Sequence, residues 1–281
     1  MAKKINSSTK VRVLAAVALA PVLLAVLFLA PKIMTAIMLS LFCAIGAYEL
    51  LYGTGLVKHP RLTLYTAILA ALVPFWCYYG HVMLWAKIAL LAFFGLVFME
   101  IMVSHLQVKF NQAAVCVAGA VLIPYLLCAL VRLMVLPAGR YVIAIPFVLA
   151  FASDTGAYFV GCRFGRHKMA PVISPKKSVE GLFGGIASAI ICMFLYCLIM
   201  DKGFDFDVKY GYALAYGFFG SLAGVFGDLC FSAVKRQTGI KDYGNLIPGH
   251  GGILDRFDSV LVVAPLVEIL LEVLPVVVQN G

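Results

Sequence analysis

Long apolar runs alternate with short polar turns along the whole chain. A helix needs about 20 mostly apolar residues to cross the hydrocarbon core of a bilayer. Nine stretches reach that length, with edges that are soft by a few residues. They are 11–30, 33–52, 63–80, 84–104, 113–136, 141–162, 180–200, 210–232 and 259–277. The pattern therefore predicts an all-α, polytopic membrane helix bundle with about nine transmembrane helices.

The polar segments do not divide the chain into separate domains. No internal repeat and no low-complexity linker is present, so residues 1–281 are predicted to form a single integral membrane domain. Residues 1–140 would supply N-terminal helices, and residues 141–281 hold the main polar motifs. The first apolar run lacks a clear small-residue cleavage site, so it is predicted to be a membrane helix and not a cleaved signal peptide.

Composition supports a membrane protein. Hydrophobic residues make up 63% of the chain and charged residues only 12%, whereas a soluble globular protein has about 25% charged residues. A water-exposed surface cannot be built from so few charges. The eight cysteines form no CxxC pair, which argues against a zinc site or a redox dithiol and favours small apolar side chains in a helix bundle.

The formal net charge of +9 bears on partners and orientation. In a membrane protein such a charge reflects cytoplasmic loops and anionic headgroups, so we predict membrane lipids and no nucleic acid as partners. We place the N-terminus in the cytoplasm, which puts most of the 22 basic residues on that side. The two largest basic loops there contain Arg163, Arg166, Lys168, Lys176, Lys177, Lys235, Arg236, Lys241 and Arg256. The chain is thus predicted to be a multi-pass protein of the cytoplasmic (inner) membrane, with its C-terminus outside.

Acidic residues inside spans are costly and mark functional positions by default. Asp154 and Asp228 each lie toward the cytoplasmic end of a predicted span and lead into a basic loop. The structural alternatives are a polar helix contact for Asp154 and a buried salt bridge from Asp228 to Lys235 or Arg236. We favour a functional role, because the oxygen ligands that a hard cation needs gather nearby. The other acids in predicted spans, to which the pattern assigns no function, are Glu49, Glu100, Glu268 and Glu272.

The first polar loop is formed by residues 173–181. Ser178 is a predicted N-cap for the span that follows, and glycines occupy the opening turns of that span. Unused N–H groups and the helix dipole at such a start favour an anion, and Lys176 and Lys177 come just before it. Together these features suggest phosphate binding. A basic anchor for lipid headgroups is an equally good interpretation.

The second polar stretch, residues 232–258, gathers bases, acids and glycines. Asp255 and Asp258 are three apart and would share one face of a helix that starts near Leu254. Paired carboxylates suit Mg²⁺, which takes one or two carboxylates together with phosphate oxygens. Three roles stay open for His250: hydrogen-bond donor to a phosphate, proton carrier or structural residue. The stretch therefore indicates metal-dependent phosphoryl or nucleotidyl transfer.

This second stretch resembles the signature of the phosphatidate cytidylyltransferases, also called CDP-diacylglycerol synthases. The matching positions are Ser232, Lys235-Arg236, Lys241-Asp242, Gly244, Ile247-Pro248, His250-Gly251-Gly252, Asp255-Arg256 and Asp258. Residues 154–165 and 174–181 are also similar to segments of that family. The resemblance covers roughly the C-terminal half of the chain.

The resemblance implies an enzyme that transfers the cytidylyl group of CTP to phosphatidate, giving CDP-diacylglycerol and pyrophosphate in phospholipid biosynthesis, with Mg²⁺. It implies metal ligands at Asp228, Asp255 and Asp258, which a second cation such as K⁺ could share. The residues carried over as catalytic are Lys235, Arg236, Lys241, Asp242, His250 and Arg256. Those carried over as substrate-binding are Asp154, Ser174, Lys176, Lys177, Ser178, Glu180, Gly181, Gly251 and Gly252. A homodimer is compatible with the sequence.

Other functions compete with this one. Cytidylyl transfer to a different lipid phosphate would use the same motifs. An ion-coupled transporter would line an ion path with Asp154, Asp228, Glu268 and Glu272. That alternative leaves the basic loops and the glycine-rich turn unexplained. The CDP-alcohol phosphotransferases are disfavoured, because their signature of spaced aspartates is absent from the sequence.

Overall fold

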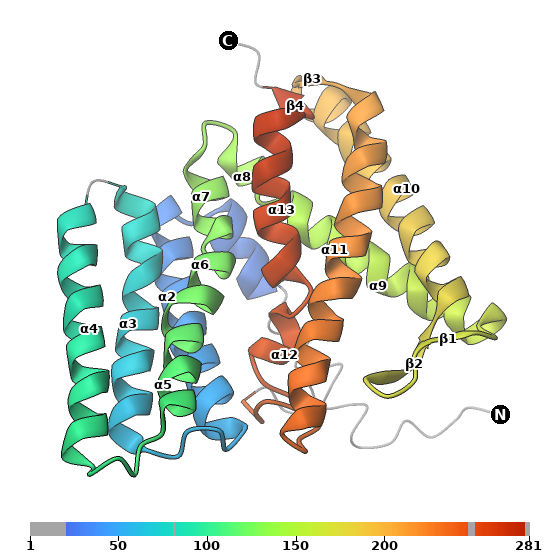
Figure 1. Cartoon of the computed structure of the whole chain (residues 1–281). Helices are drawn as coiled ribbons and strands as arrows, with labels where there is room; N and C mark the ends of the chain where they lie inside the picture. The colour runs from blue at the N-terminus through green and yellow to red at the C-terminus, as the bar shows by residue number, and fades with distance from the viewer. Residues whose placement is uncertain (1–20, 81, 247–250, 279–281) are drawn as a thin grey trace. The chain divides into compact units, whose positions relative to one another are not determined.

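The computed structural model is mostly helical and describes residues 21–80, 82–246 and 251–278 (Figure 1). Of the first predicted span, residues 11–20 lie outside the described residues, and residues 21–28 are helical. Helices dominate because a backbone in hydrocarbon must satisfy its hydrogen bonds within the protein.

Seven predicted spans coincide with seven long apolar helical segments among the described residues, each within a few residues of its expected bounds. These candidate membrane spans are Lys32–Gly53, Pro60–Tyr79, Met83–Val103, Phe110–Val135, Gly139–Phe164, Val179–Phe204 and Tyr210–Gln237. Their length and composition are those of a multi-pass membrane protein.

Three of these spans contain more than one helical element. The first joins α2 (Lys32–Tyr48) to the π-helical turn η1 (Glu49–Gly53). The fourth consists of α5 (Phe110–Val117), η2 (Ala118–Leu122), α6 (Ile123–Leu127) and α7 (Ala129–Val135). The fifth consists of α8 (Gly139–Val142) and α9 (Ala144–Phe164). The single-helix spans are α3 (Pro60–Tyr79), α4 (Met83–Val103), α10 (Val179–Phe204) and α11 (Tyr210–Gln237).

The last predicted span, 259–277, is shorter than expected. A helix does begin at Leu254, but α12 (Leu254–Phe257) ends before Asp258, and α13 (Val260–Val273) follows it. The 14 residues of α13 rise about 21 Å at 1.5 Å per residue, less than the hydrocarbon core of about 30 Å. The described residues also include four short strands, which are β1 (Lys168–Ala170), β2 (Ser174–Ser178), β3 (Asp207–Val208) and β4 (Val277–Val278).

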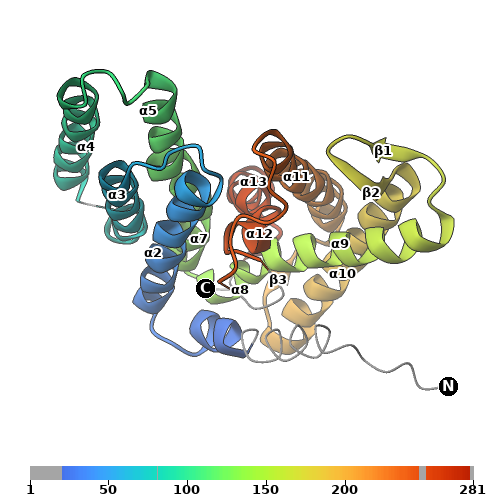
Figure 2. The ribbon, with the colours of Figure 1, turned by 90° about the horizontal axis from the view of Figure 1, so that it is seen from below.

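The chain forms two compact units. Unit 1 consists of residues 1–131 and 237–257, and unit 2 of residues 132–236 and 258–281. This division does not test the expectation of a single membrane domain, which stays a prediction. In unit 1, α3 packs against α2 and α4 (Figures 1 and 2).

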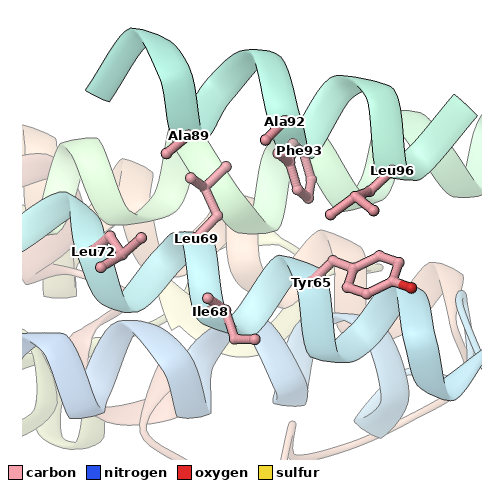
Figure 3. Close-up of a pocket in the computed structure, with 8 residues that line it drawn as sticks. All are labelled: Tyr65, Ile68, Leu69, Leu72, Ala89, Ala92, Phe93 and Leu96. Carbon is pink, nitrogen blue, oxygen red and sulfur yellow. The ribbon is translucent and has the colours of Figure 1, made fainter. Parts of the chain in front are cut away.

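An apolar pocket lies between α3 and α4 of unit 1 (Figure 3). Leu69 and Leu72 line it from α3, and Ala89 and Phe93 line it from α4. The hydroxyl of Tyr65 is the one side-chain polar group in this lining. The pocket is therefore an apolar gap between two candidate spans, and its lining holds no charged group that could bind a phosphate.

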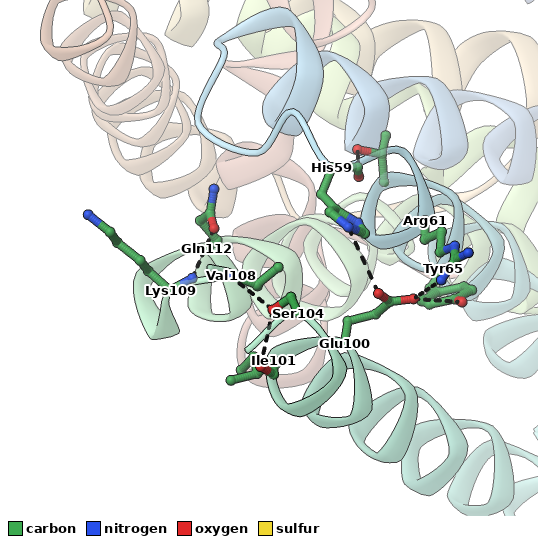
Figure 4. A network of polar contacts seen from close by, with 10 residues as sticks. His59, Arg61, Tyr65, Glu100, Ile101, Ser104, Val108, Lys109 and Gln112 are labelled. Carbon is green, nitrogen blue, oxygen red and sulfur yellow. Dashed lines mark hydrogen bonds and ion pairs between the residues drawn. The ribbon is translucent and has the colours of Figure 1, made fainter. Parts of the chain in front are cut away.

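A polar network joins the same two helices near the start of α3 (Figure 4). Glu100 is buried at the end of α4 and accepts a hydrogen bond from the Tyr65 hydroxyl at 3.3 Å. Arg61 lies 3.5 Å and His59 3.9 Å from its carboxylate oxygens. Glu100 is therefore paired with side chains of α3 and of the connection that precedes it, and these contacts indicate a structural role for this acid.

In unit 2, the glycines of α11 allow α9 and α10 to approach it closely. A Cβ at Gly217 would come within 2.5 Å of Ile190 on α10, and one at Gly220 within 2.7 Å of Leu149 on α9. Elsewhere in this unit Arg132 forms a bidentate ion pair with Glu268, at 2.6 Å and 2.8 Å. Glu268 thus has a partner that the sequence pattern did not indicate.

Candidate active site

A hairpin of β1 and β2 leads into α10 of unit 2. The strands pair antiparallel, with Lys168 opposite Ser178. Ser178 is the N-cap of α10, as predicted, and its hydroxyl accepts a hydrogen bond from the amide of Gly181 at 3.1 Å. The Gly181 N–H is therefore used by the cap, so the expectation that it is an unused donor for an anion is wrong.

Glu180 anchors the segment between α9 and the hairpin. Its carboxylate accepts hydrogen bonds from the backbone amides of Arg166 and His167, and it lies 2.6 Å from Nδ1 of His167. This side chain, which the resemblance places among the substrate-binding residues, holds the turn before β1. Ser174 begins β2, and Lys176 is exposed on that strand.

Small residues pack α9 tightly against α10. A Cβ at Gly156 would collide with Ser188, and one at Gly184 would collide with Val160. The glycines at the start of α10 therefore serve helix packing, which lets the two backbones approach. In this arrangement the charges of Lys177 and Asp228 both act on Asp154 of α9.

Lys177 and Asp228 join the hairpin to α11. Nζ of Lys177 lies 2.6 Å from Oδ2 of Asp228. The other carboxylate oxygen of Asp228 accepts a hydrogen bond from the hydroxyl of Ser232 at 3.0 Å. The structural alternative considered for Asp228 paired it with Lys235 or Arg236, but the observed ion pair reaches the first polar loop instead. Because both side chains are largely buried, this pair is screened less than a surface pair.

Asp258 approaches the same pair from the link between α12 and α13. Gly227 makes room for it, because a Cβ there would come within 2.5 Å of the main-chain oxygen of Asp258. Oδ1 of Asp258 accepts a hydrogen bond from the amide of Ser259 at 2.7 Å. Burial, and next the negative charge of Asp228, raise the pKa of the Asp258 carboxyl to about 7. Two neighbouring carboxylates repel each other when both are ionised, and a bound cation would offset this repulsion.

Two bases at the end of α11 have different surroundings. Lys235 is buried, and its positive charge acts on Asp258. Arg236 is exposed, and its Nε donates a hydrogen bond to the main-chain oxygen of Ile173 at 3.2 Å. Arg236 therefore holds the turn between β1 and β2. The residues whose charges meet in unit 2 are named the charged cluster, and they are Asp154, Lys177, Asp228, Lys235 and Asp258.

Most of the second polar stretch belongs to unit 1. Asp255 is buried, and its Oδ2 accepts hydrogen bonds from the amides of Tyr243 at 2.8 Å and Gly252 at 3.0 Å. This oxygen closes the loop, and the role of Asp255 as a metal ligand stays a prediction. Gly251 has a positive φ of 85°. The predicted site residues Lys241, Asp242 and Arg256 are exposed, and His250 lies outside the described residues.

Glu49 is a residue of this loop's surroundings whose role the sequence left open. It is buried in η1, and its two carboxylate oxygens accept hydrogen bonds from the amides of Ile253 and Leu254. Its partners lie 204 and 205 residues further along the chain. The residues next to Glu49 in the sequence give no indication of such a contact. An acid at the end of an apolar span is as compatible with a structural role as with a functional one.

The donor set of the charged cluster fits a hard divalent cation. Within the described part of the chain, no group of three or more His, Cys, Asp or Glu side chains converges on one point. Mg²⁺ does not require one, since it usually takes one or two carboxylates and completes its shell with water and phosphate oxygens. Asp228 and Asp258 supply that number of carboxylates. Lys177 and Lys235 beside them can offset negative charge on a phosphate.

The chain is similar to a known protein family over most of its length. The model of the Cytidylyltransferase family matches residues 10–274. A phosphatidate cytidylyltransferase of Staphylococcus epidermidis is 46% identical over 132 residues, which cover 47% of this chain and 49% of that protein. The enzymes of the same name from Staphylococcus saprophyticus and Staphylococcus aureus are 45% and 43% identical over 133 residues, covering 47% of this chain and 50% of each relative. The matched stretch thus spans about half the length of these curated relatives.

Proposed function

Because the chain belongs to the Cytidylyltransferase family, we propose that it is a phosphatidate cytidylyltransferase, which converts CTP and phosphatidate to CDP-diacylglycerol and pyrophosphate. The names of its relatives support this activity. The observation that carries the proposal is the charged cluster of unit 2, where the Lys177–Asp228 ion pair lies beside Asp258. Bases and carboxylates gathered in an apolar chain suit the handling of phosphate and metal together.

The reaction is a substitution at the α-phosphorus of CTP. A phosphate oxygen of phosphatidate attacks that phosphorus, and a new phosphorus–oxygen bond forms. The bond to the oxygen that bridges the α- and β-phosphates breaks, and pyrophosphate leaves with its electron pair. The nucleophile is already anionic at neutral pH, so no strong general base is needed. The main obstacle is repulsion between two polyanions and the charge that builds on the leaving group.

The residues of the charged cluster address that obstacle. Lys177 and Lys235 offset negative charge on the phosphates, and fixed cations of this kind need no rearrangement as the transition state forms. Asp228 and Asp258 would hold Mg²⁺, and Ser232 fixes one oxygen of Asp228 through its hydroxyl. Bound Mg²⁺ would neutralise charge on the phosphate oxygens that it contacts. A second cation such as K⁺ would share these carboxylates.

Roles are also proposed for residues of the second polar stretch that lie in unit 1. The resemblance supports metal binding by Asp255 and phosphate binding by the exposed Lys241 and Arg256. One substrate is a lipid and the other is water-soluble. The reaction must therefore take place at a membrane surface, and the bias of basic residues supports the cytoplasmic surface.

Purified protein in lipid–detergent micelles tests this function directly. With CTP, phosphatidate and MgCl₂, we expect CDP-diacylglycerol and pyrophosphate in equal amounts, with activity lost on chelation and restored by added Mg²⁺. Turnover with a polyisoprenyl phosphate but not with phosphatidate would identify a different lipid acceptor. Absence of turnover with every lipid phosphate and divalent cation tried would overturn the proposal.

A further inference from the structure

The carboxylate of Glu49 is buried against the backbone of a distant loop. Only 3% of the residue is exposed. Oε1 accepts a hydrogen bond from the amide of Ile253 at 3.0 Å, and Oε2 accepts one from the amide of Leu254 at 2.9 Å. Both oxygens are therefore engaged with two successive N–H groups at the start of α12. Hydrogen bonds to a charged acceptor are stronger than neutral ones.

Two glycines of that loop lie so close to the same carboxylate that a Cβ would not fit between them. A Cβ at Gly244 would lie 2.6 Å from Oε1 of Glu49, and a Cβ at Gly252 would collide with the carboxylate. The fit extends to the end of η1, because a Cβ at Gly53 would collide with the main-chain oxygen of Tyr243. Glycine at these positions is explained by close approach and not by an unusual backbone angle.

A second buried carboxylate, that of Asp255, also fixes the backbone of this loop. Oδ2 of Asp255 accepts hydrogen bonds from the amides of Tyr243 and Gly252. The backbone amides of residues 252, 253 and 254 are thus all fixed by two buried acids, Glu49 and Asp255. Asp255 belongs to the second polar stretch itself, whereas Glu49 lies in the first half of the chain.

We infer that Glu49 is a positioning residue, which holds the segment Gly252–Arg256 in the conformation that the proposed cytidylyl transfer requires. The inference rests on the proposed function, because Asp255 and Arg256 are assigned there to metal and phosphate. Glu49 acts through these residues and does not touch a substrate. A misplacement of about 1 Å in a catalytic group can lower a rate by about 100-fold, so the anchor has kinetic consequences.

Glu49→Gln tests the anchor with little change in shape. Glutamine keeps one carbonyl oxygen but presents an NH₂ group where an acceptor is needed, so one of the two hydrogen bonds is lost and two donors face each other. We expect kcat/KM for CTP to fall about 10- to 100-fold, together with a rise in the Mg²⁺ concentration needed for half-maximal rate. A role in stability alone would reduce the amount of active protein and leave KM and the Mg²⁺ dependence unchanged.

Glu100→Gln is the matched control. Glu100 is also a buried glutamate of unit 1 near the end of a span, but its partners are the side chains of His59, Arg61 and Tyr65. We expect this variant to lose thermal stability while its KM for CTP and its Mg²⁺ dependence stay those of the wild type. Equal changes in these constants for both variants would overturn the inference.

Gly252→Ala probes the same contact from the loop side. Its Cβ collides with Glu49, and the collision disappears when residue 49 is alanine. The loss of kcat/KM caused by Gly252→Ala should therefore be at least about tenfold smaller in a Glu49→Ala background than in the wild type. An equal loss in both backgrounds would show that the effect of Gly252→Ala does not arise from a collision with Glu49.

Amide hydrogen exchange separates this inference from the proposed function, because it needs no activity. In Glu49→Gln we expect the amides of Ile253 and Leu254 to exchange about 10-fold faster or more, and in Glu100→Gln to exchange as in the wild type. If the wild type has no cytidylyltransferase activity, the proposed function fails and exchange still decides whether Glu49 holds the loop. Unchanged exchange at Ile253 and Leu254 in Glu49→Gln would overturn the inference.

Discussion

Asp228 offers each of its carboxylate oxygens to a different partner. Ser232, one turn later on α11, donates to Oδ1, and Lys177 from the hairpin lies against Oδ2. The serine fixes the rotamer from within the helix, and the lysine ties it to a segment 51 positions earlier in the numbering. With Asp258 close enough to be affected by its charge, Asp228 is the residue through which the charged cluster is connected.

Lys177→Ala removes the cation that is paired with Asp228. We expect kcat/KM for CTP to fall about 100-fold, which is about 2.7 kcal/mol of transition-state stabilisation, because Asp228 and Asp258 would then repel an incoming phosphate. Initial rates over a range of CTP concentrations measure the effect. Lys202→Ala is the control, since Lys202 is exposed and lies 3.3 Å from its partner Asp201. A similar loss in both variants would contradict a specific role for Lys177.

Asp258→Asn separates catalysis from folding. The substitution keeps the shape of the side chain and removes its repulsion with Asp228, so thermal stability should be unchanged or higher. Turnover should fall by about 100-fold or more, since even residues that merely support a metal ligand matter by about 10- to 100-fold. Thermal unfolding and Mg²⁺-dependent turnover, measured on the same preparation, check both expectations. Near-normal turnover would refute Asp258 as a metal ligand.

Helix packing in unit 2 depends on positions without a side chain. On α9 and α10 the small residues lie where the two helices meet, and Gly156 and Gly184 leave no space for a Cβ. Gly95 on α4 differs, because an added Cβ there would meet nothing within 4 Å. Some glycines in these spans are therefore required by close helix packing and others are not, and only the structure distinguishes the two kinds.

Gly184→Ala should destabilise the protein by about 1–3 kcal/mol, because the new Cβ collides with Val160 and the helices must move apart. Gly95→Ala is the matched control and should be neutral or stabilising by up to about 1 kcal/mol, since alanine favours the helix. Thermal unfolding in detergent measures both. A lower melting temperature for Gly95→Ala than for Gly184→Ala would reverse the assignment of the two sites.

At the level of elements, hydropathy alone is sufficient to locate a span where the apolar stretch is continuous. Seven spans could be located because about 20 apolar residues form a helix in hydrocarbon almost regardless of their neighbours. The break at Asp258 and Ser259, between α12 and α13, could not be located in this way. On either side of this break the two acids have different partners: Asp255 accepts hydrogen bonds from the amides of Tyr243 and Gly252, whereas Asp258 accepts one from the amide of Ser259.

At the level of the whole molecule, the sequence indicated which residues carry charge but not how they pair. The N-cap role of Ser178 is local and could be predicted. The pairing of Asp228 with Lys177, and of Glu49 with Ile253 and Leu254, joins distant segments. Such pairs depend on how helices pack, and a single sequence holds no direct record of them.

Orientation in the membrane is the property of the whole chain on which the proposed reaction depends. The hairpin of β1 and β2 and the β3 segment flank the two ends of α10, so they should lie on opposite sides of the membrane. The basic residues of the hairpin predict that it is cytoplasmic. A green fluorescent protein fused after Ala170 should fluoresce, and an alkaline phosphatase fused after Asp207 should be active. The reverse result would place Lys177 on the side that cytoplasmic CTP cannot reach, and the proposed reaction would then lack its water-soluble substrate.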